Sequence, residues 1–282
     1  MASVEVRRLR LWQERIATDV EIAGGGPPLV YLHGPWGLNP DRSFITHLAG
    51  THTVYAPRFP GTTQGDSEAV HQLDSWLDLV DYHGELLDAL KLDHPIFAGH
   101  SFGGLLAAEF AAAVPKSVAK LVLIDPVGLW RDDLPVKNWM VLSDAERRRL
   151  LFADPAGEGA KRFFAVPSDA KERVDVLSQF IWSQACTGKF VWPLPDRGLK
   201  NRIHRIGAPA LIVWGDADGI IAPDYAKSER EAWDRNSAKA VRHGELGNAL
   251  VRIAGLFGFF AQVAAFCAFV SLYYFARAVL GA

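Results

Sequence analysis

Short apolar stretches alternate along this chain with longer stretches that carry apolar residues at helical spacing. The short stretches predict β-strands, because most of them are followed by residues that terminate strands and form turns, such as Gly, Pro or Asp. They are Val4 to Leu11, Ile16 to Ile22, Leu29 to Leu32, Thr53 to Ala56, Ile96 to Ala98, Leu121 to Ile124 and Ala210 to Trp214. The last two are almost wholly apolar, which is typical of buried parallel strands. The alternation predicts an α/β fold.

Two of the longer stretches predict helices that pack on such a sheet. One of them has apolar residues on one side and acidic residues on the other. The apolar residues are Trp76, Leu79, Val80, Leu86, Leu87 and Leu90. This spacing is typical of an amphipathic surface helix. The other, Leu105 to Ala113, is rich in alanine, the strongest helix former.

Between about Gly128 and Arg205 the alternation gives way to an irregular sequence rich in aromatic residues. This stretch is too long for an ordinary connection within a compact sheet. We therefore expect residues 129–205 to form an inserted, mainly helical cap. Residues 1–128 and 206–248 would form the core, and residues 249–282 an apolar tail.

The tail contains 24 consecutive uncharged residues, Ile253 to Ala276, between Arg252 and Arg277. At ~1.5 Å per residue, a helix of this length spans a hydrocarbon layer ~30 Å thick. We expect a transmembrane helix over 253–276, with a buried final helix of the core as the alternative. Basic residues are more frequent before this segment than after it, which would leave the main domain at the cytoplasmic face of a membrane.

Length and composition narrow the class of protein. At 282 residues the chain is long enough for one large domain with an insertion. A net charge of -2 gives no electrostatic reason to expect a nucleic-acid partner. The two cysteines, Cys186 and Cys267, are far apart, which predicts neither a disulfide framework nor a metal site. Met1 to Arg15 has no apolar run of signal-peptide length, so we expect a cytoplasmic protein.

The clearest chemical signal is Ser101, which lies between Gly99, His100, Phe102 and Gly103. A serine hydroxyl becomes an effective nucleophile only when a neighbouring base takes its proton and the chain presents it to a substrate. A tight strand-to-helix turn presents it in this way and requires small residues two positions before and two after the serine. Here the motif follows an apolar strand and begins a helix, so we expect Ser101 to be the nucleophile.

The chain resembles the α/β-hydrolase family over about Leu29 to Tyr225. The resemblance rests on elements that occur in the family's order: the His33–Gly34 turn, the Ser101 turn, Asp125 at a strand end and the run Trp214 to Asp218. It implies a mostly parallel sheet of about eight strands flanked by helices, with the site at the carboxyl ends of the strands. It also implies serine chemistry that needs neither a cofactor nor a metal.

The resemblance further implies an oxyanion hole with two backbone N–H donors. One belongs to the residue after the nucleophile, Phe102, and the other to the turn that follows the third strand. Pro35 has no N–H and cannot be that second donor. Trp36 is therefore the expected donor, with Gly37 as the alternative.

For the acid of a Ser-His-Asp triad, the resemblance points to Asp218, and Asp125 is the alternative. The base must follow the acid in the chain, and His243 is the histidine that does so. The family has a Gly-His pair at this point, whereas this chain has Arg242 before His243 and Gly244 after it. Either His243 works on a remodelled loop, or the triad is broken, or the sequence beyond about Tyr225 is altered by a reading-frame error or gene fusion.

Other histidines are expected to have different roles. His33 and His100 belong to motifs in which histidines usually brace loops. His204 precedes the seventh strand and should lie at the wrong end of the sheet for catalysis.

Aromatic residues of the cap are expected to roof a cleft above Ser101, with Trp130, Trp139 and Trp182 as pocket residues. Such a pocket suits a small-molecule substrate with an apolar or aromatic acyl group. We therefore expect a cofactor-free serine hydrolase acting on a small or medium ester. The alternatives are a ligand-binding protein without a working base, and carbon–carbon bond hydrolysis or peroxidase chemistry at the same site.

Overall fold

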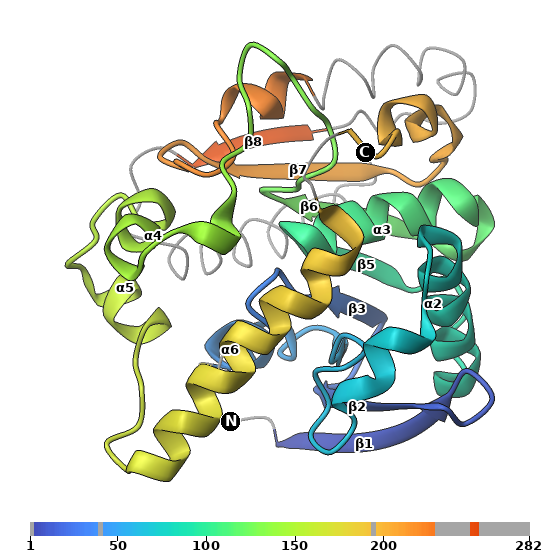
Figure 1. Ribbon diagram of the computed structural model, residues 1–282. Coiled ribbons are helices and arrows are strands. Elements are labelled where there is room, and N and C mark those ends of the chain that lie inside the picture. The colour runs from blue at the N-terminus through green and yellow to red at the C-terminus, as the bar shows by residue number, and fades with distance from the viewer. Residues whose placement is uncertain (1–2, 39–41, 193–195, 229–248, 254–282) are drawn as a thin grey trace.

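The computed structural model describes residues 3–38, 42–192, 196–228 and 249–253. One twisted sheet runs through it in the order β1-β2-β4-β3-β5-β6-β7-β8 (Figure 1). The strands are β1 (Val4–Leu11), β2 (Ile16–Ala23), β3 (Pro28–Leu32), β4 (Thr53–Pro57), β5 (Ile96–His100), β6 (Lys120–Ile124), β7 (Ala210–Gly215) and β8 (Ala249–Ile253). Strand β2 pairs antiparallel with β1 and with β4, and all other pairs are parallel. The predicted mostly parallel α/β sheet is confirmed.

Helices occupy most of the connections. They are α1 (Ser43–Leu48), α2 (Trp76–Leu90), α3 (Phe102–Ala113), α4 (Asp144–Leu151), α5 (Glu158–Phe163) and α6 (Ala170–Val191). Short 3-10 helices cover Ser67–Gln72, Pro115–Ser117, Trp139–Val141, Leu199–Asn201 and Ile203–Arg205. Helix α2 begins at a capping box, in which Ser75 and Asp78 each accept a backbone N–H of the other. It ends where Lys91 adopts a left-handed conformation, at φ 56°.

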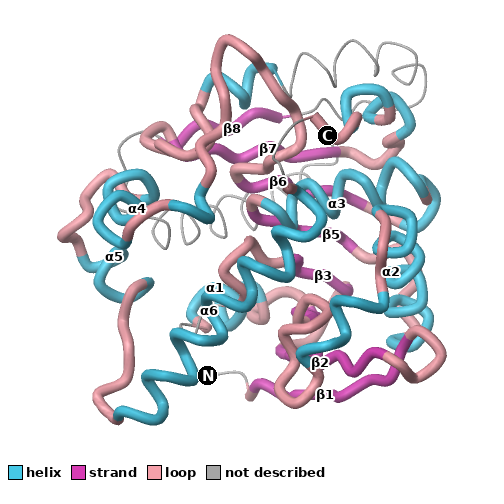
Figure 2. The backbone as a smooth tube through the Cα atoms, viewed as in Figure 1, coloured by secondary structure: helices cyan, strands magenta, loops and turns pink. Residues whose placement is uncertain are grey.

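Alternate residues of the central strands face two separate hydrophobic cores. In β3, Val30 and Leu32 belong to the core that contains α2 and α3, whereas Leu29 and Tyr31 belong to the core that contains α1. The same alternation occurs in β6. A strand buried on both faces reads as a continuous apolar run, which is why these strands were predictable. The sheet is the middle layer between helices, as Figure 2 shows.

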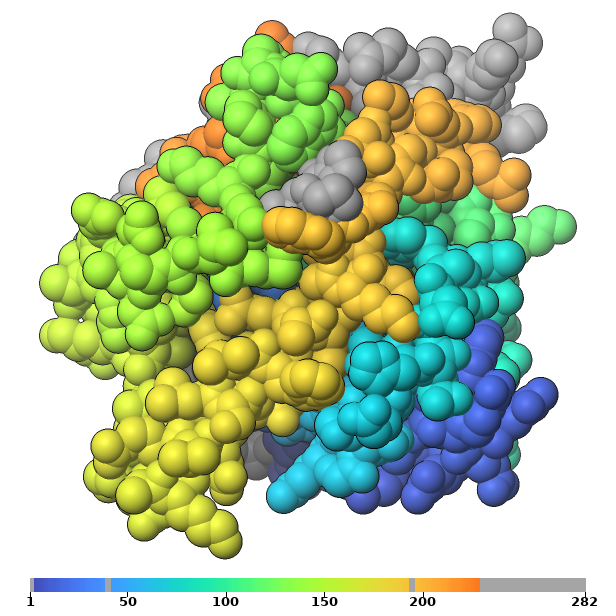
Figure 3. Space-filling view, in the orientation of Figure 1, coloured from blue at the N-terminus to red at the C-terminus, as the bar shows by residue number. Residues whose placement is uncertain are grey.

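The segment between β6 and β7, which we call the cap, contains α4, α5 and α6, and its longest helix, α6, lies against the core (Figure 3). Gln179 donates a side-chain hydrogen bond to the Thr62 carbonyl at 2.9 Å, and Trp182 donates to the Gly61 carbonyl at 2.7 Å. Two further bonds join α6 to the core, from Trp76 to the Phe190 carbonyl and from Lys189 to the Val70 carbonyl. Side-chain bonds to backbone carbonyls therefore hold this helix over the loop that follows β4.

Strand β8 lies at the start of the predicted tail, residues 249–282. Ala249–Ile253, which the sequence assigned to the tail, forms β8 and pairs in parallel with β7. The predicted transmembrane segment 253–276 begins at the last residue of this strand, and the rest of it lies outside the described residues. Within the part of the chain that the structure describes, no helix is long and apolar enough to cross a membrane. The spanning helix therefore stays a prediction.

Candidate active site

Ser101 lies at the sharp turn between β5 and α3. Its backbone has φ 52° and ψ -113°, a conformation that a residue with a side chain adopts only under strain. The turn is held on both sides: Ser101 donates its N–H to the Ile124 carbonyl at 2.9 Å, and its own carbonyl accepts the N–H groups of Gly104 and Leu105. The surrounding structure thus fixes a strained serine at the carboxyl end of the sheet.

Gly99 and Gly103, on either side of Ser101, leave no room for a side chain. A Cβ on Gly99 would lie 2.2 Å from the Gly103 carbonyl oxygen, and a Cβ on Gly103 would lie 2.1 Å from the Leu32 carbonyl oxygen. Carbon–oxygen contacts this short are far inside van der Waals distance, so any side chain at either position would force backbone apart. The spacing that identified Ser101 in the sequence therefore follows from the close approach of α3 to β3.

The residue after the serine, Phe102, belongs to the hydrophobic core. Phe102 is buried, and its ring makes an edge contact with Phe59 at 5.2 Å between centroids. As the first residue of α3, it lies where backbone N–H groups have no partner within the helix. The positive end of the α3 dipole is thus directed at Ser101, where it would stabilise negative charge.

The turn after β3 lies close to the Ser101 turn, since a Cβ on Gly34 would lie 2.7 Å from His100 Nδ1. Gly37, the alternative oxyanion donor, already donates its N–H to the Gly34 carbonyl at 3.2 Å and has φ 80°. The Trp36 ring stacks on Phe180 of the cap at 6.3 Å and meets Phe163 edge-on at 5.8 Å. The cap therefore packs directly on this turn.

His33 braces the turn rather than facing outward. Its Nδ1 donates to the Gly34 carbonyl at 2.8 Å, and its Nε2 accepts the Phe59 N–H at 3.1 Å. Burial lowers its pKa to about 4, which keeps the ring neutral and able to accept that bond. Burial also lowers the pKa of His100 to about 3.

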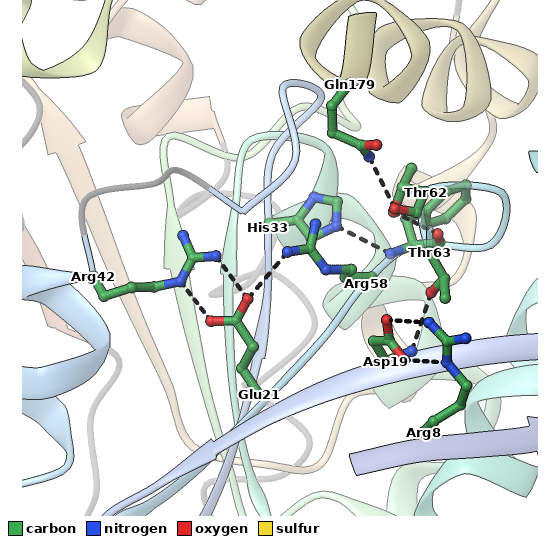
Figure 4. A network of polar contacts seen from close by, with 10 residues as sticks. Arg8, Asp19, Glu21, His33, Arg42, Arg58, Thr62, Thr63 and Gln179 are labelled. Carbon is green, nitrogen blue, oxygen red and sulfur yellow. Dashed lines mark hydrogen bonds and ion pairs between the residues drawn. The ribbon is translucent and has the colours of Figure 1, made fainter. Parts of the chain in front are cut away.

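Charged side chains reinforce the same region (Figure 4). Buried Glu21 on β2 forms ion pairs with Arg42, at the start of α1, and with Arg58, after β4. Arg42 ends the segment that follows His33, and Arg58 directly precedes Phe59, whose N–H His33 accepts. Glu21 thus ties together the chain segments that frame the turn.

Asp125 and Asp218 follow two neighbouring parallel strands, β6 and β7, and so lie at the same edge of the sheet. Asp125 accepts the Gly215 N–H at 2.7 Å. Asp218 accepts the N–H groups of Ile220 and Ile221 at 2.8 and 2.9 Å, both through Oδ1. The two residues weighed as alternative acids are therefore close neighbours.

Both carboxyl groups resist ionisation. Burial raises the pKa of Asp125 well above its usual value, and the charge of Asp218 raises it further. Burial also raises the pKa of Asp218 to about 7, although two backbone N–H groups and the Lys137 charge oppose the rise. Two carboxylates in one desolvated site cannot both ionise easily, so the pair titrates as a unit.

This pair predicts a pH-dependent stability. Between about pH 4 and pH 7 the unfolded chain releases these protons while the folded protein keeps them, so stability falls as the pH rises through this window. Asp125→Asn should remove the part of that penalty that comes from Asp125, making the variant more stable than the wild type at pH 8 by ~1.4 kcal/mol for each pKa unit by which folding raises Asp125. Near pH 4 the difference should vanish. Urea unfolding at the two pH values measures it.

The control is Asp88→Asn, the same substitution on the exposed face of α2. It should change stability little at either pH. An Asp125→Asn protein that loses the same stability as the wild type between pH 4 and pH 8 would show that Asp125 is not the source of the dependence.

The predicted pocket residues take different places. Trp130 and Trp139 line a cavity of about 20 Å³ beneath the cap, together with Leu105, Val127, Gly128, Leu129, Val136, Val191 and Arg197. That volume holds about one water molecule. Trp182 instead bonds the Gly61 carbonyl.

The predicted base, His243, lies outside the described residues.

The sequence did not identify Ser183 of α6, which is fully buried and lies over the turn that precedes α1. Its hydroxyl is 3.1 Å from the position that a Cβ on Gly37 would take. The only sequence signal was a cluster of polar residues in an otherwise aromatic cap.

Two known hydrolases are similar to this chain over most of its length. Pimeloyl-(acyl-carrier protein) methyl ester esterase of Shewanella woodyi is 28% identical over 222 residues, which cover 72% of this chain and 80% of that protein. The 2-hydroxy-6-oxo-6-phenylhexa-2,4-dienoate hydrolase of Burkholderia cepacia is 26% identical over 220 residues, covering 72% and 75%.

Solved structures show the same fold. Naproxen esterase from Bacillus subtilis superposes with a TM-score of 0.65 at 16% identity, covering 97% of this chain and 92% of that one. A family model described as the alpha/beta hydrolase family matches residues 29–250, which is most of the chain and includes every element described above from α1 to β7. The protein therefore belongs to the alpha/beta hydrolase family.

Proposed function

We propose that this protein is a cofactor-free serine hydrolase that cleaves a small or medium ester, or a related acyl compound, with an apolar or aromatic acyl group. The observation that carries the proposal is the backbone of Ser101, held at positive φ on a turn that excludes any side chain at Gly99 and Gly103. Strain of this kind persists where function requires it. A buried serine with an ordinary packing role would have no need of it.

In the proposed mechanism Ser101 attacks the substrate carbonyl while His243 takes its proton and later returns it to the leaving group. Asp218 orients the imidazole. Both N–H bonds to Asp218 use Oδ1, so Oδ2 is left to accept a bond from the base. Asp125 instead holds Gly215, at the end of the neighbouring strand, which favours Asp218 as the acid.

The oxyanion that forms in this step would be held by the backbone N–H groups of Phe102 and Trp36. Phe102 begins α3, so its N–H faces away from the helix interior. Gly37 already donates to Gly34, which favours Trp36 over Gly37 as the second donor. Each such donor is typically worth ~10²–10³ in rate.

Carbon–carbon bond hydrolysis is a second candidate reaction. It is favoured by the similarity to the Burkholderia cepacia dienoate hydrolase, which matches over about the same share of the chain as the Shewanella woodyi esterase. The same nucleophile and acid would serve both reactions, so the substrate alone distinguishes them.

Labelling by a fluorophosphonate probe tests the proposal. The probe requires an activated serine, so we expect stoichiometric labelling of the wild type, located at Ser101 by peptide mass spectrometry. His243→Ala should slow labelling by ~10³ or more, because a serine without its base is a weak nucleophile. The matched control is His71→Ala, an exposed histidine of the segment Ser67–Gln72, which should label at the wild-type rate.

Two results would contradict the proposal. Folded wild-type protein that does not label would favour a ligand-binding protein without a working base. Labelling of His243→Ala at the wild-type rate would remove His243 from the mechanism.

A further inference from the structure

The cavity of about 20 Å³ beneath the cap lies beside the Ser101 turn. Two of its lining residues, Leu105 and Val127, donate their backbone N–H groups to the Ser101 carbonyl at 3.1 and 3.3 Å. Val127 follows β6, whereas Val191 and Arg197, which also line the cavity, precede β7. The chain therefore enters and leaves the cap at this cavity, and a group bound there lies next to the turn that carries the nucleophile.

The cavity has an arginine in its wall but no acid to pair with it. Arg197 is the only charged residue among those that line it, and its side chain forms no ion pair within the described part of the chain. Acidic groups close to Arg197 in the fold have other partners. Asp196 pairs with Lys200, and Glu109 accepts two bonds from Arg202, at 2.6 and 2.8 Å. Arg197 thus brings an uncompensated positive charge to an otherwise apolar wall.

The two tryptophans of the cavity differ in how their indole N–H groups are used. Trp130 donates to Asp132 at 2.9 Å, whereas Nε1 of Trp139 is buried and has no partner among the described residues. Nε of Arg197 is buried and unpaired in the same way. Other unpaired donors, such as Nε of Arg147, belong to residues that do not line this cavity. Because an unpaired buried donor is costly, two of them in the wall of one cavity point to a ligand that accepts from both.

The lining determines which ligand group fits. The indole and guanidinium N–H groups can only donate, and the other side chains of the wall are apolar apart from the indole N–H of Trp130, which is already paired. A hydroxyl would bring a proton that no lining side chain accepts. A ketone would leave the charge of Arg197 uncompensated. A carboxylate supplies both the acceptors and the negative charge. The volume, which holds about one water molecule, matches one carboxylate oxygen and is too small for a phosphate.

We propose that Arg197 and Trp139 form a subsite for a free carboxylate at the far end of the acyl group. The preferred substrates are then monoesters of dicarboxylic acids, with the ester carbonyl at Ser101 and an apolar chain between the two ends. This inference rests on the proposed hydrolase function and names the acyl group that it cleaves.

Binding to the Ser101→Ala protein tests the subsite without requiring turnover. Calorimetry would compare the monomethyl esters of succinate, adipate and suberate with two neutral ligands of the same chain length: the dimethyl ester and the methyl ester of the monocarboxylic acid. At least one monomethyl ester should bind about tenfold more tightly than both neutral ligands. The dimethyl ester keeps the carbonyl oxygen and loses the charge, so it separates recognition of charge from hydrogen bonding to a neutral carbonyl.

Two substitutions, each added to the Ser101→Ala protein, locate the preference. Arg197→Met keeps an unbranched side chain but removes the charge and the donor, so the ratio of dissociation constants should fall to about one. The backbone carbonyl of Arg197, which accepts a bond from Arg202 at 2.7 Å, is unaffected by this change. Trp139→Phe removes the indole N–H and should lower the ratio by about threefold or more. Thermal unfolding confirms that each variant is folded.

Arg149→Met is the matched control, because Arg149 is an exposed arginine of α4 in the same cap. It should keep the full ratio. If no monomethyl ester bound more tightly than its neutral partners, or if Arg197→Met left the ratio unchanged, the inference would be overturned. A dimethyl ester that binds as tightly as the best monomethyl ester would overturn the choice of a carboxylate.

The same measurements separate this inference from the proposed function. Probe labelling and ester turnover without a preference for the monomethyl esters would leave the hydrolase and remove the subsite. A preference in the Ser101→Ala protein, with no labelling of the wild type, would leave the subsite on a protein that binds without cleaving.

Discussion

Ser101→Ala is expected to lower kcat/KM for ester hydrolysis by ~10⁴ or more, because the attacking oxygen is lost while binding is kept. Folding should change little, since the Ser101 hydroxyl is not among the bonds that hold the turn; those use its backbone. A panel of nitrophenyl esters of increasing acyl length measures the rate, and thermal unfolding confirms that the variant is folded.

A second substitution at the same position sharpens this prediction. Ser101→Gly should be equally inactive yet more stable than Ser101→Ala by ~1 kcal/mol, because glycine accepts φ 52° without strain. Ser178→Ala, on the exposed face of α6, is the activity control. If Ser101→Ala retained more than a few per cent of the wild-type rate, Ser101 would not be the nucleophile. If glycine gave no gain in stability, the turn would not store strain.

The parts of this fold that could be predicted are those in which a local pattern has one physical cause. Strand β6 was predicted within one residue, since a strand buried on both faces must be apolar throughout. The turn at Ser101 was equally clear, because steric exclusion at Gly99 and Gly103 leaves glycine as the residue that fits.

Other elements were missed because their patterns conflict with their surroundings. Helix α6 has Val174 and Ile181 on its exposed face and Ser183 on its buried face, so periodicity could not assign it a core-facing side. Helix α1 is only six residues long. Strand β8 lies within the stretch that the sequence assigned to the apolar tail, so its residues were interpreted together with the tail.

The proximity of Asp125 and Asp218 could be predicted only in part. The sequence identifies each of them as a candidate acid but gives no sign that the two lie side by side. Their proximity follows from the parallel pairing of β6 and β7, which puts the loops after both strands at one edge. A sequence pattern describes one strand end at a time and cannot show two acids sharing a desolvated site.

Gly103→Ala is expected to be severely damaging, with a loss of at least ~3 kcal/mol of folding free energy or failure to fold. The new Cβ would lie 2.1 Å from the Leu32 carbonyl oxygen and 2.7 Å from that of His33. These are backbone atoms of β3 and of the turn that carries Trp36, and no rotamer change can relieve the contact. Chemical denaturation measures the loss.

The matched control is Gly84→Ala, in the middle of α2, where a Cβ would meet nothing within 4 Å. Alanine favours a helix over glycine, so this variant should gain ~0.5–1 kcal/mol. The two variants add the same methyl group and differ only in what it touches. If Gly103→Ala were as stable as the wild type, α3 could move away from β3. Ser101 would then not be rigidly held, and the strain argument for its role as nucleophile would fail with it.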